Sequence, residues 1–157
     1  CLIISILNEY KKSFGVGIDT SVKALQAANI NKIKMSLKNR LRLINTSYRK
    51  YDSSDFDIVV ANPPYISKDE INKISREVRN FEPLSALYAQ SSGLKHYREI
   101  ITKLQNPKRK QIIFFEIGHK QSEIVIKLLK NMGFMILDVY NDLSDIPRCI
   151  VTKKNFI

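Results

Sequence analysis

The sequence is poor in cysteine, and its two cysteines, Cys1 and Cys149, stand at opposite ends of the chain. Such a pair fits neither a disulfide framework nor the spacing of metal-ligating cysteines. The two histidines, His96 and His119, also lack a second histidine or a carboxylate at ligand spacing, so we expect them at the surface. We therefore expect a protein of a reducing compartment, the cytoplasm, with no bound metal.

Long apolar runs are absent as well. No run approaches the roughly 18 residues that a membrane-spanning helix requires. The apolar residues 1–7 have no basic region before them and no small-residue cleavage site after them, so we do not interpret them as a signal peptide. Repeats and linkers rich in proline or glycine are also lacking. With 44% hydrophobic and 26% charged residues in a chain of 157, the composition predicts one folded domain without a membrane partner.

Basic residues outnumber acidic ones, and the formal net charge is +11. The basic residues are spread along the chain, with a denser patch only at Lys108, Arg109 and Lys110. One interpretation is a nucleic-acid or ribonucleoprotein partner, which includes proximity to the ribosome. The other is compositional, because the chain is rich in Lys, Ile and Asn throughout and solvated basic faces are common. Charge alone identifies no partner.

The order of the local patterns predicts an α/β domain with a mostly parallel sheet, because strand-like runs alternate with helical ones. The expected strands are residues 14–18, 41–44, 56–61, 112–117, 134–139 and 149–152, of which the last two form an antiparallel hairpin. The expected helices are residues 2–10, 21–35, 94–104 and 124–132. The last two carry apolar residues in a stripe along one face; Ile124 belongs to the stripe of the last helix, which Gly133 ends. The apolar run 56–61 is typical of a strand buried on both faces. Residues 65–90 form a long polar stretch, and long loops are often functional.

The glycine pair Gly15 and Gly17 belongs to an expected strand and not to a phosphate-binding loop. A doubly wound sheet that binds an adenosine cofactor begins with a strand and a glycine-rich turn into a helix. This chain begins already in that helix. We therefore expect a truncated amino end, with the first strand and the glycine loop before Cys1.

The tetrapeptide Asn62-Pro63-Pro64-Tyr65 follows directly on the expected strand 56–61, which predicts a place at the carboxyl edge of the sheet, where open α/β folds bind ligands. An amino group on a carbonyl or an aromatic ring is a poor nucleophile, because its lone pair is delocalised. The Asn62 side-chain oxygen and a backbone carbonyl can accept both of its hydrogens. The prolines fix φ and remove a competing donor, and the Tyr65 ring packs on the planar group. The pattern indicates methyl transfer to such a nitrogen.

The alternative for the tetrapeptide is a simple turn after a strand. A turn needs neither the preceding Asn nor the following aromatic residue, so we favour the catalytic interpretation.

Asp19 ends the strand expected at residues 14–18, where a carboxylate can accept both ribose hydroxyls of an adenosine cofactor. Its alternative role is to cap the next helix together with Thr20 and Ser21. Glu116 lies near the end of the strand expected at residues 112–117 and faces the same edge. For Glu116 we favour a structural role, in which it satisfies loop amides, over a place in the pocket.

Several segments together resemble one enzyme family: 18–21 with 24 and 27–29, 56–66, 78–87, 115–118, 142–143 and 146–148. Over nearly its whole length the chain is similar to the peptide chain release factor N(5)-glutamine methyltransferases, the PrmC/HemK family. The segment Phe81-Glu82-Pro83 discriminates most, because nucleic-acid methyltransferases that share the Asn-Pro-Pro-Tyr motif lack it.

The resemblance implies a class I, Rossmann-like, S-adenosylmethionine-dependent methyltransferase fold. It also implies that a glutamine side-chain amide in a release factor, the protein partner, is methylated in translation termination. The implied cofactor residues are Asp19 at the ribose, Tyr48 near the adenine and Asn62. The implied substrate residues, which hold the glutamine amide, are Asn62, Pro63, Pro64 and Tyr65.

The chain also departs from the family's pattern. Ser47 stands where an acidic residue is common, and Asp145 stands where glycine is usual. The resemblance further implies that residues 1–157 are a partial catalytic domain, without the cofactor glycine loop and the helical amino-terminal domain that binds the substrate.

Two other functions remain open. One is a methyltransferase that acts on the exocyclic amine of adenine or guanine, which the basic charge favours and Phe81-Glu82-Pro83 disfavours. The other is a non-catalytic fragment of either enzyme, which the start inside a helix suggests.

In this fold the missing first strand lies in mid-sheet, between the strands that end at Asp19 and Asn62. Unpaired buried backbone groups cost about 1 to 3 kcal/mol each, and several of them exceed the roughly 5 to 15 kcal/mol that stabilise a domain. We predict that a polypeptide of these 157 residues alone folds poorly and does not bind S-adenosylmethionine. Titration calorimetry tests this, and micromolar binding would contradict it.

Overall fold

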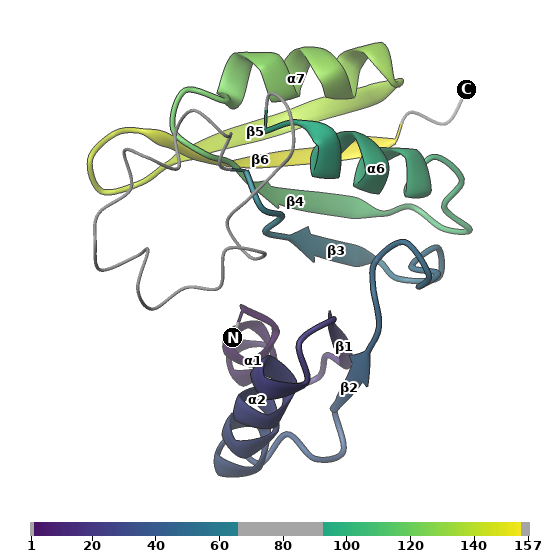
Figure 1. The fold of residues 1–157 in the computed structure, drawn as a ribbon, viewed down its shortest axis with the longest axis vertical. Helices are drawn as coiled ribbons and strands as arrows, with labels where there is room; N and C mark the ends of the chain where they lie inside the picture. The colour runs from purple at the N-terminus through teal and green to yellow at the C-terminus, as the bar shows by residue number, and fades with distance from the viewer. Residues whose placement is uncertain (1, 66–92, 155–157) are drawn as a thin grey trace. The chain divides into compact units, whose positions relative to one another are not determined.

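The computed structural model describes residues 2–65 and 93–154. The chain divides into two compact units, unit 1 (Cys1–Asp52) and unit 2 (Ser53–Ile157), each with its own sheet (Figure 1). No helix in the described ranges is long and apolar enough to span a membrane.

Unit 1 contains α1 (Leu2–Glu9), β1 (Gly15–Asp19), α2 (Val22–Lys34) and β2 (Leu41–Asn45). The two strands pair in parallel, from Gly15 opposite Leu41 to Asp19 opposite Asn45. The elements expected over residues 2–45 are thus confirmed, with ends that differ by at most one residue. Because the pairing is parallel, the carboxyl ends of β1 and β2 meet at one edge of this sheet.

The core of unit 1 is an aliphatic cluster in which α1 packs on the sheet. It contains Ile4, Leu7, Leu37 and Leu41. Gly15 permits α1 to approach β1 closely, because a Cβ at this position would lie 2.7 Å from the Cδ1 atom of Ile3. Gly15 and Gly17 lie within β1, as the sequence predicts.

Arg40 anchors the end of α1 in unit 1. Its Nη1 atom donates to the carbonyl oxygens of Leu7, Tyr10 and Ser13 at 2.9, 3.3 and 3.1 Å. The last carbonyls of a helix have no partner within the helix, and a cation at this end also complements the helix dipole. One of the many basic residues of this chain therefore serves the fold.

Unit 2 contains β3 (Ile58–Ala61), α6 (Lys95–Lys103), β4 (Ile112–Glu116), α7 (Ser122–Asn131), β5 (Phe134–Asn141) and β6 (Pro147–Lys154). The strand order is β3-β4-β6-β5. β3 and β4 are parallel, whereas β6 is antiparallel to both β4 and β5. The expected α/β architecture, with parallel pairs and an antiparallel carboxyl-terminal hairpin, is confirmed.

Helices α6 and α7 lie over one face of the sheet of unit 2 (Figure 1). The buried side chains of β4 alternate accordingly, and Phe115 meets the ring of Tyr97 edge-on, with ring centroids 6.0 Å apart. The predicted apolar stripes of both helices are buried, as shown by Tyr97, Ile100 and Ile101 on α6 and by Val125, Leu128 and Leu129 on α7. Ile124 was expected in the stripe of α7 but is exposed, because it lies off the buried face.

The expectation that β3 is buried on both faces is wrong. Ile58 and Val60 are 54% and 39% exposed. Val59 and Ala61 are half-buried and pair with buried residues of β4. Only the face that α6 and α7 cover excludes water, so burial alternates along the strand. β3 is also shorter than predicted, since it begins at Ile58.

Two backbone positions with positive φ explain local sequence choices. Gly133, with φ of 77°, follows the end of α7 and confirms the predicted helix stop. Asp145 has φ of 59° in the turn between β5 and β6, a conformation that glycine adopts at least cost. The usual glycine of the family at this position therefore has a physical reason.

We predict that Arg40→Met lowers the free energy of unfolding by about 1 to 3 kcal/mol, because three carbonyl groups lose a charged donor. Arg42→Met on β2 is the matched control, since Arg42 is exposed, and it should change stability by less than about 0.5 kcal/mol. Urea denaturation followed by circular dichroism compares the two. Equal effects would show that the carbonyl contacts of Arg40 do not matter.

Candidate active site

The tetrapeptide Asn62-Pro63-Pro64-Tyr65 leaves the carboxyl end of β3 in unit 2. Its neighbour β4 ends beside it, because Ala61 pairs with Phe115 in the parallel ladder. The tetrapeptide thus lies at the edge expected from the sequence. Pro63 is buried, whereas Asn62 is exposed.

A side-chain amide ties the end of the tetrapeptide to the turn after β4. The Nε2 atom of Gln121 donates to the carbonyl oxygen of Tyr65 at 2.9 Å. The Oε1 atom of Gln121 accepts the backbone N–H of Gly118 at 3.1 Å. Gln121 therefore bridges two loops at the carboxyl edge of this sheet.

Two glycines surround this bridge. A Cβ on Gly93 would lie 2.6 Å from both the Tyr65 carbonyl oxygen and Gln121 Nε2, and Gly93 has φ of 73°. A Cβ on Gly118 would lie 2.7 Å from the Cδ2 atom of the Tyr65 ring. Because no side chain fits at either place, the backbone packs directly against Tyr65 and Gln121.

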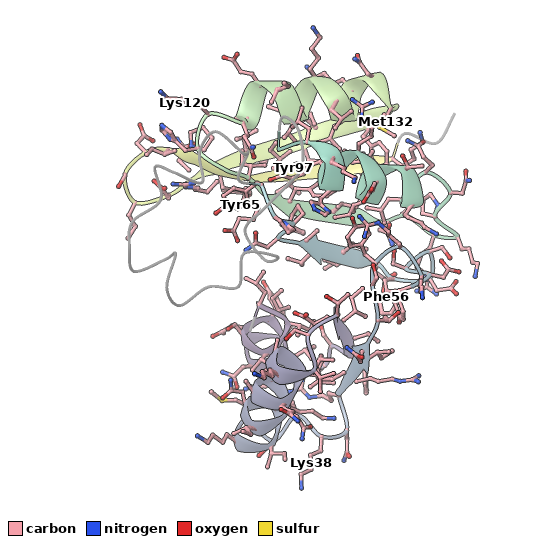
Figure 2. The ribbon with its side chains drawn as sticks, viewed as in Figure 1. Lys38, Phe56, Tyr65, Tyr97, Lys120 and Met132 are labelled. Atoms are coloured by element: carbon pink, nitrogen blue, oxygen red, sulfur yellow. The ribbon has the colours of Figure 1, made fainter. Side chains whose placement is uncertain are left out.

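Tyr97 supports the same edge from α6 (Figure 2). Its hydroxyl donates to the carbonyl oxygen of Glu116 at 2.9 Å. Burial raises the pKa of Tyr97 far above its usual value, and the nearby Tyr65 phenol adds to the effect. The Tyr97 hydroxyl therefore keeps its proton and remains a donor at any physiological pH.

Glu116, the last residue of β4, was expected to have a structural role. The residue is half-buried at the end of β4, opposite Cys149 of β6. Burial raises the pKa of the Cys149 thiol, and the Glu116 carboxylate raises it further. The structural role expected for the carboxylate, satisfaction of loop amides, remains a prediction.

Asp19 is exposed at the carboxyl end of β1 in unit 1. Its Oδ1 atom accepts the backbone N–H of Ser21 at 2.7 Å. Ser21 itself is the N-cap of α2, since its Oγ accepts the N–H of Ala24 at 3.2 Å. The capping role considered for this segment is therefore real, and it uses one of the roughly four acceptor positions of the Asp19 carboxylate.

Asn45 holds the backbone on which Asp19 sits. Its Nδ2 atom donates to the carbonyl oxygens of Asp19 and Thr20, both at 3.0 Å. Asn45 pairs with Asp19 at the ends of the two parallel strands. Asn45 was not among the residues expected at this site, although its place directly after an apolar strand is a signal that points to it.

Tyr48 is half-buried and follows β2, with the guanidinium carbon of Arg49 5.0 Å from the centroid of its ring. Ser47, which replaces the family's common acidic residue, uses its Oγ to accept the N–H of Arg49 at 3.2 Å. Asp19 thus ends β1 and Tyr48 follows β2, both in unit 1. Asn62 and Tyr65 belong to unit 2.

Two of the three residues in the dense basic patch have acidic partners within unit 2. Lys108 Nζ lies 3.0 Å from Asp55 Oδ2, and Arg109 Nη1 lies 3.0 Å from Asp57 Oδ1. These side chains are more than half exposed, so the pairs add little stability. They do reduce the positive charge that the patch offers to a nucleic acid.

The two histidines differ from one another. His119 is exposed, as expected. His96 is half-buried, and its Nδ1 atom lies 3.9 Å from Glu99 Oε2, so both the surface position and the lack of a nearby carboxylate were wrong for it. The cause is helical spacing, since residues three apart share a face of α6. Within residues 2–65 and 93–154, no three His, Cys, Asp or Glu side chains could hold a metal ion.

Two sequence features lie outside the described residues. They are the segment Phe81-Glu82-Pro83 and most of the polar stretch at residues 65–90.

The comparisons with known proteins agree with the geometry. The family model described as "Eco57I restriction-modification methylase" matches residues 6–137. The chain is 38% identical over 154 residues to a release factor glutamine methyltransferase of Fusobacterium nucleatum, with 96% of this chain and 43% of that protein covered. It is 33% identical over 156 residues to one of Thermodesulfovibrio yellowstonii, with 99% and 56% covered. The chain therefore spans about half the length of these curated relatives.

A solved structure shows the same fold. A methyltransferase of Pyrococcus furiosus superposes with a TM-score of 0.69 at 10% identity, over 99% of this chain and 70% of that one. Such low identity speaks for the fold alone, and the class I methyltransferase fold expected from the sequence is confirmed. The resemblance to release factor glutamine methyltransferases is confirmed by the two relatives.

We predict that Gly93→Ala lowers the melting temperature clearly more than Gly133→Ala. Both glycines have positive φ, so both changes carry the left-handed penalty of about 1 to 2 kcal/mol. At Gly93 the new methyl group also meets the backbone of Tyr65, whereas at Gly133 it meets the flexible end of Lys154. Scanning calorimetry compares the variants, and equal losses would show that the packing around Tyr65 is loose.

Proposed function

We propose, because this chain belongs to the Eco57I restriction-modification methylase family, that it is the catalytic part of a methyltransferase. Its substrate is the side-chain amide nitrogen of a glutamine in a peptide chain release factor, and its methyl donor is S-adenosylmethionine. The substrate is that named for the relatives similar to almost the whole chain. The observation that carries the proposal is the place of Asn62-Pro63-Pro64-Tyr65, with Asn62 exposed at the carboxyl edge of the sheet.

The residues of unit 1 fit an adenosine cofactor. Asp19 presents an exposed carboxylate at the end of a strand, and its hydrogen bond to the Ser21 amide leaves acceptor positions for the two ribose hydroxyls. Asn45 holds the turn that carries Asp19. The ring of Tyr48 supplies an aromatic surface for the adenine, and the hydroxyl of Ser47 takes the place of the common acidic residue.

The cofactor, when bound, supplies an electrophilic methyl group on a sulfonium sulfur. The chain's own residues make the amide nitrogen reactive. The Oδ1 atom of Asn62 and the carbonyl oxygen of Pro63 accept its two hydrogens, which orients the nitrogen lone pair and raises its electron density. No N–H from the next residue competes for this place, because Pro64 lacks one.

The other parts of the tetrapeptide hold the substrate in position. The ring of Tyr65 packs on the planar amide group, as aromatic faces do on flat groups. When the nitrogen gains the methyl group it loses one of its two protons, which passes to solvent because amide oxygens are too weakly basic to keep it. Catalysis of this kind depends on positioning and on fixed dipoles, without a covalent intermediate.

The proposal predicts that labelled methyl transfer from S-adenosylmethionine appears on a glutamine of a release factor. The protein as its gene encodes it is the enzyme in this assay, with purified release factor and nucleic acid offered separately. Label on the release factor supports the proposal. Label only on the exocyclic amines of nucleic acid, or no label on either substrate, would contradict the proposal.

The same assay tests Asn62. Asn62→Ala should lower kcat/KM by a factor of about 10² to 10³, because the substrate amide loses an oriented acceptor that acts in the transition state. Asn39→Ala, at another exposed asparagine, is the control and should leave the rate unchanged. A variant at Asn62 with the full rate would remove this side chain from the mechanism.

A further inference from the structure

We propose that Gln121 is a positioning residue for the tetrapeptide Asn62-Pro63-Pro64-Tyr65, and that its side-chain amide sets the direction of the Tyr65 carbonyl. This role rests on the proposed function, since it concerns the residues that hold the substrate amide. Gln121 is separated from Tyr65 by 56 positions in the sequence and meets it only in the folded chain.

The orientation of the Gln121 amide is unambiguous. The backbone N–H of Gly118 can only donate, and it lies 3.1 Å from one end of the amide, so that end is the Oε1 oxygen. The other end is then the Nε2 donor, and it lies 2.9 Å from the Tyr65 carbonyl oxygen, which can only accept. Both contacts therefore match donor to acceptor, and a flipped amide would mismatch both.

The tetrapeptide needs an outside partner because its own sequence offers few. Pro63 and Pro64 have no N–H, so the middle of this segment cannot be held through amide hydrogens as an ordinary loop is. Its carbonyl oxygens can still accept hydrogen bonds from other parts of the chain. The Gln121 amide occupies the one at Tyr65.

The surroundings leave the bridge little room to move. The positions of Gly93 and Gly118 bring backbone within contact of both Gln121 and Tyr65, where a Cβ would lie 2.6 to 2.9 Å away. The Tyr97 hydroxyl lies 3.5 Å from Gln121 Oε1 and holds the end of β4 through Glu116. A shielded network of this kind strengthens each hydrogen bond.

Loss of the bridge should therefore affect the chemical step more than cofactor binding. Without the Nε2 donor the Tyr65 carbonyl can rotate, and the Tyr65 ring and the Asn62 side chain lose their relative position. A misplacement of about 1 Å can lower a rate by about 10²-fold. The hydrogen bonds that Asp19 accepts from Ser21 and Asn45 lie within unit 1 and do not involve Gln121.

The test is Gln121→Glu, which keeps the size and the acceptor for Gly118 but replaces the donor to Tyr65 with an oxygen. Gln105→Glu is the matched control, because Gln105 Nε2 also donates to a backbone carbonyl, that of Met132, at 3.0 Å. Gln105 lies just past the end of α6, and its side chain contacts Met132 and Lys154, which are not part of the tetrapeptide. Both changes add one negative charge to a partly buried glutamine.

We expect kcat for release factor methylation to fall about 10- to 100-fold in Gln121→Glu and to stay within about twofold in Gln105→Glu. The KM for S-adenosylmethionine should stay within about threefold in both. The deficit of Gln121→Glu should shrink as the pH is lowered from about 8 to about 5.5, because partial burial and the facing Tyr65 carbonyl oxygen favour the protonated glutamate, which donates to that carbonyl again. A purely structural defect would not recover in this way.

A second readout does not depend on activity. In the ¹⁵N spectrum of the protein, the Asn62 side-chain amide should shift or broaden in Gln121→Glu but not in Gln105→Glu. An unchanged kcat, an unshifted Asn62 amide, or equal losses in both variants would overturn the positioning role. If the wild-type protein does not methylate a release factor, the proposed function fails, and the Asn62 signal alone then decides the role of Gln121.

Discussion

Parallel pairing of strands is the constraint on which the candidate site depends. In a parallel ladder the carboxyl ends of neighbouring strands lie side by side, so the residues that follow them gather at one edge. In unit 2 this brings the tetrapeptide after β3 to the end of β4, and in unit 1 it places Asp19 beside Asn45. Each unit thereby presents polar groups at a single edge of its sheet.

A segment built around two prolines has to be held from outside. Pro63 and Pro64 supply rigidity in φ but no hydrogen-bond donors, which is useful for exposing carbonyl groups to a substrate and unhelpful for anchoring the loop. Pro63 is buried, and other elements supply the donors. The Gln121 amide donates to the Tyr65 carbonyl, and the Tyr97 hydroxyl donates to the carbonyl of Glu116 at the end of β4. Gly93 and Gly118 make the close packing possible.

Several of the basic residues have partners within the chain itself, so the basic composition is not by itself evidence of a nucleic-acid partner. Arg40 satisfies the carbonyl groups at the end of α1, and Lys108 and Arg109 pair with Asp55 and Asp57. Arg148 binds the Asp142 carboxylate at 2.8 Å in the turn between β5 and β6, which lowers the pKa of Asp142. A count of charges therefore overstates what the surface offers to a partner.

The sequence by itself determined the order of the elements, the place of Asn62-Pro63-Pro64-Tyr65 after a strand, and the N-cap at Ser21, because periodicity, apolar runs and caps are local signals. It also carried the resemblance to release factor glutamine methyltransferases, which the relatives confirm. Only the tertiary structure decided the one-sided burial of β3, since that depends on which face α6 and α7 cover. It alone also decided that Gln121 reaches Tyr65 and that Asn45 holds Asp19, because contacts between distant positions follow from packing and leave no local pattern in the chain.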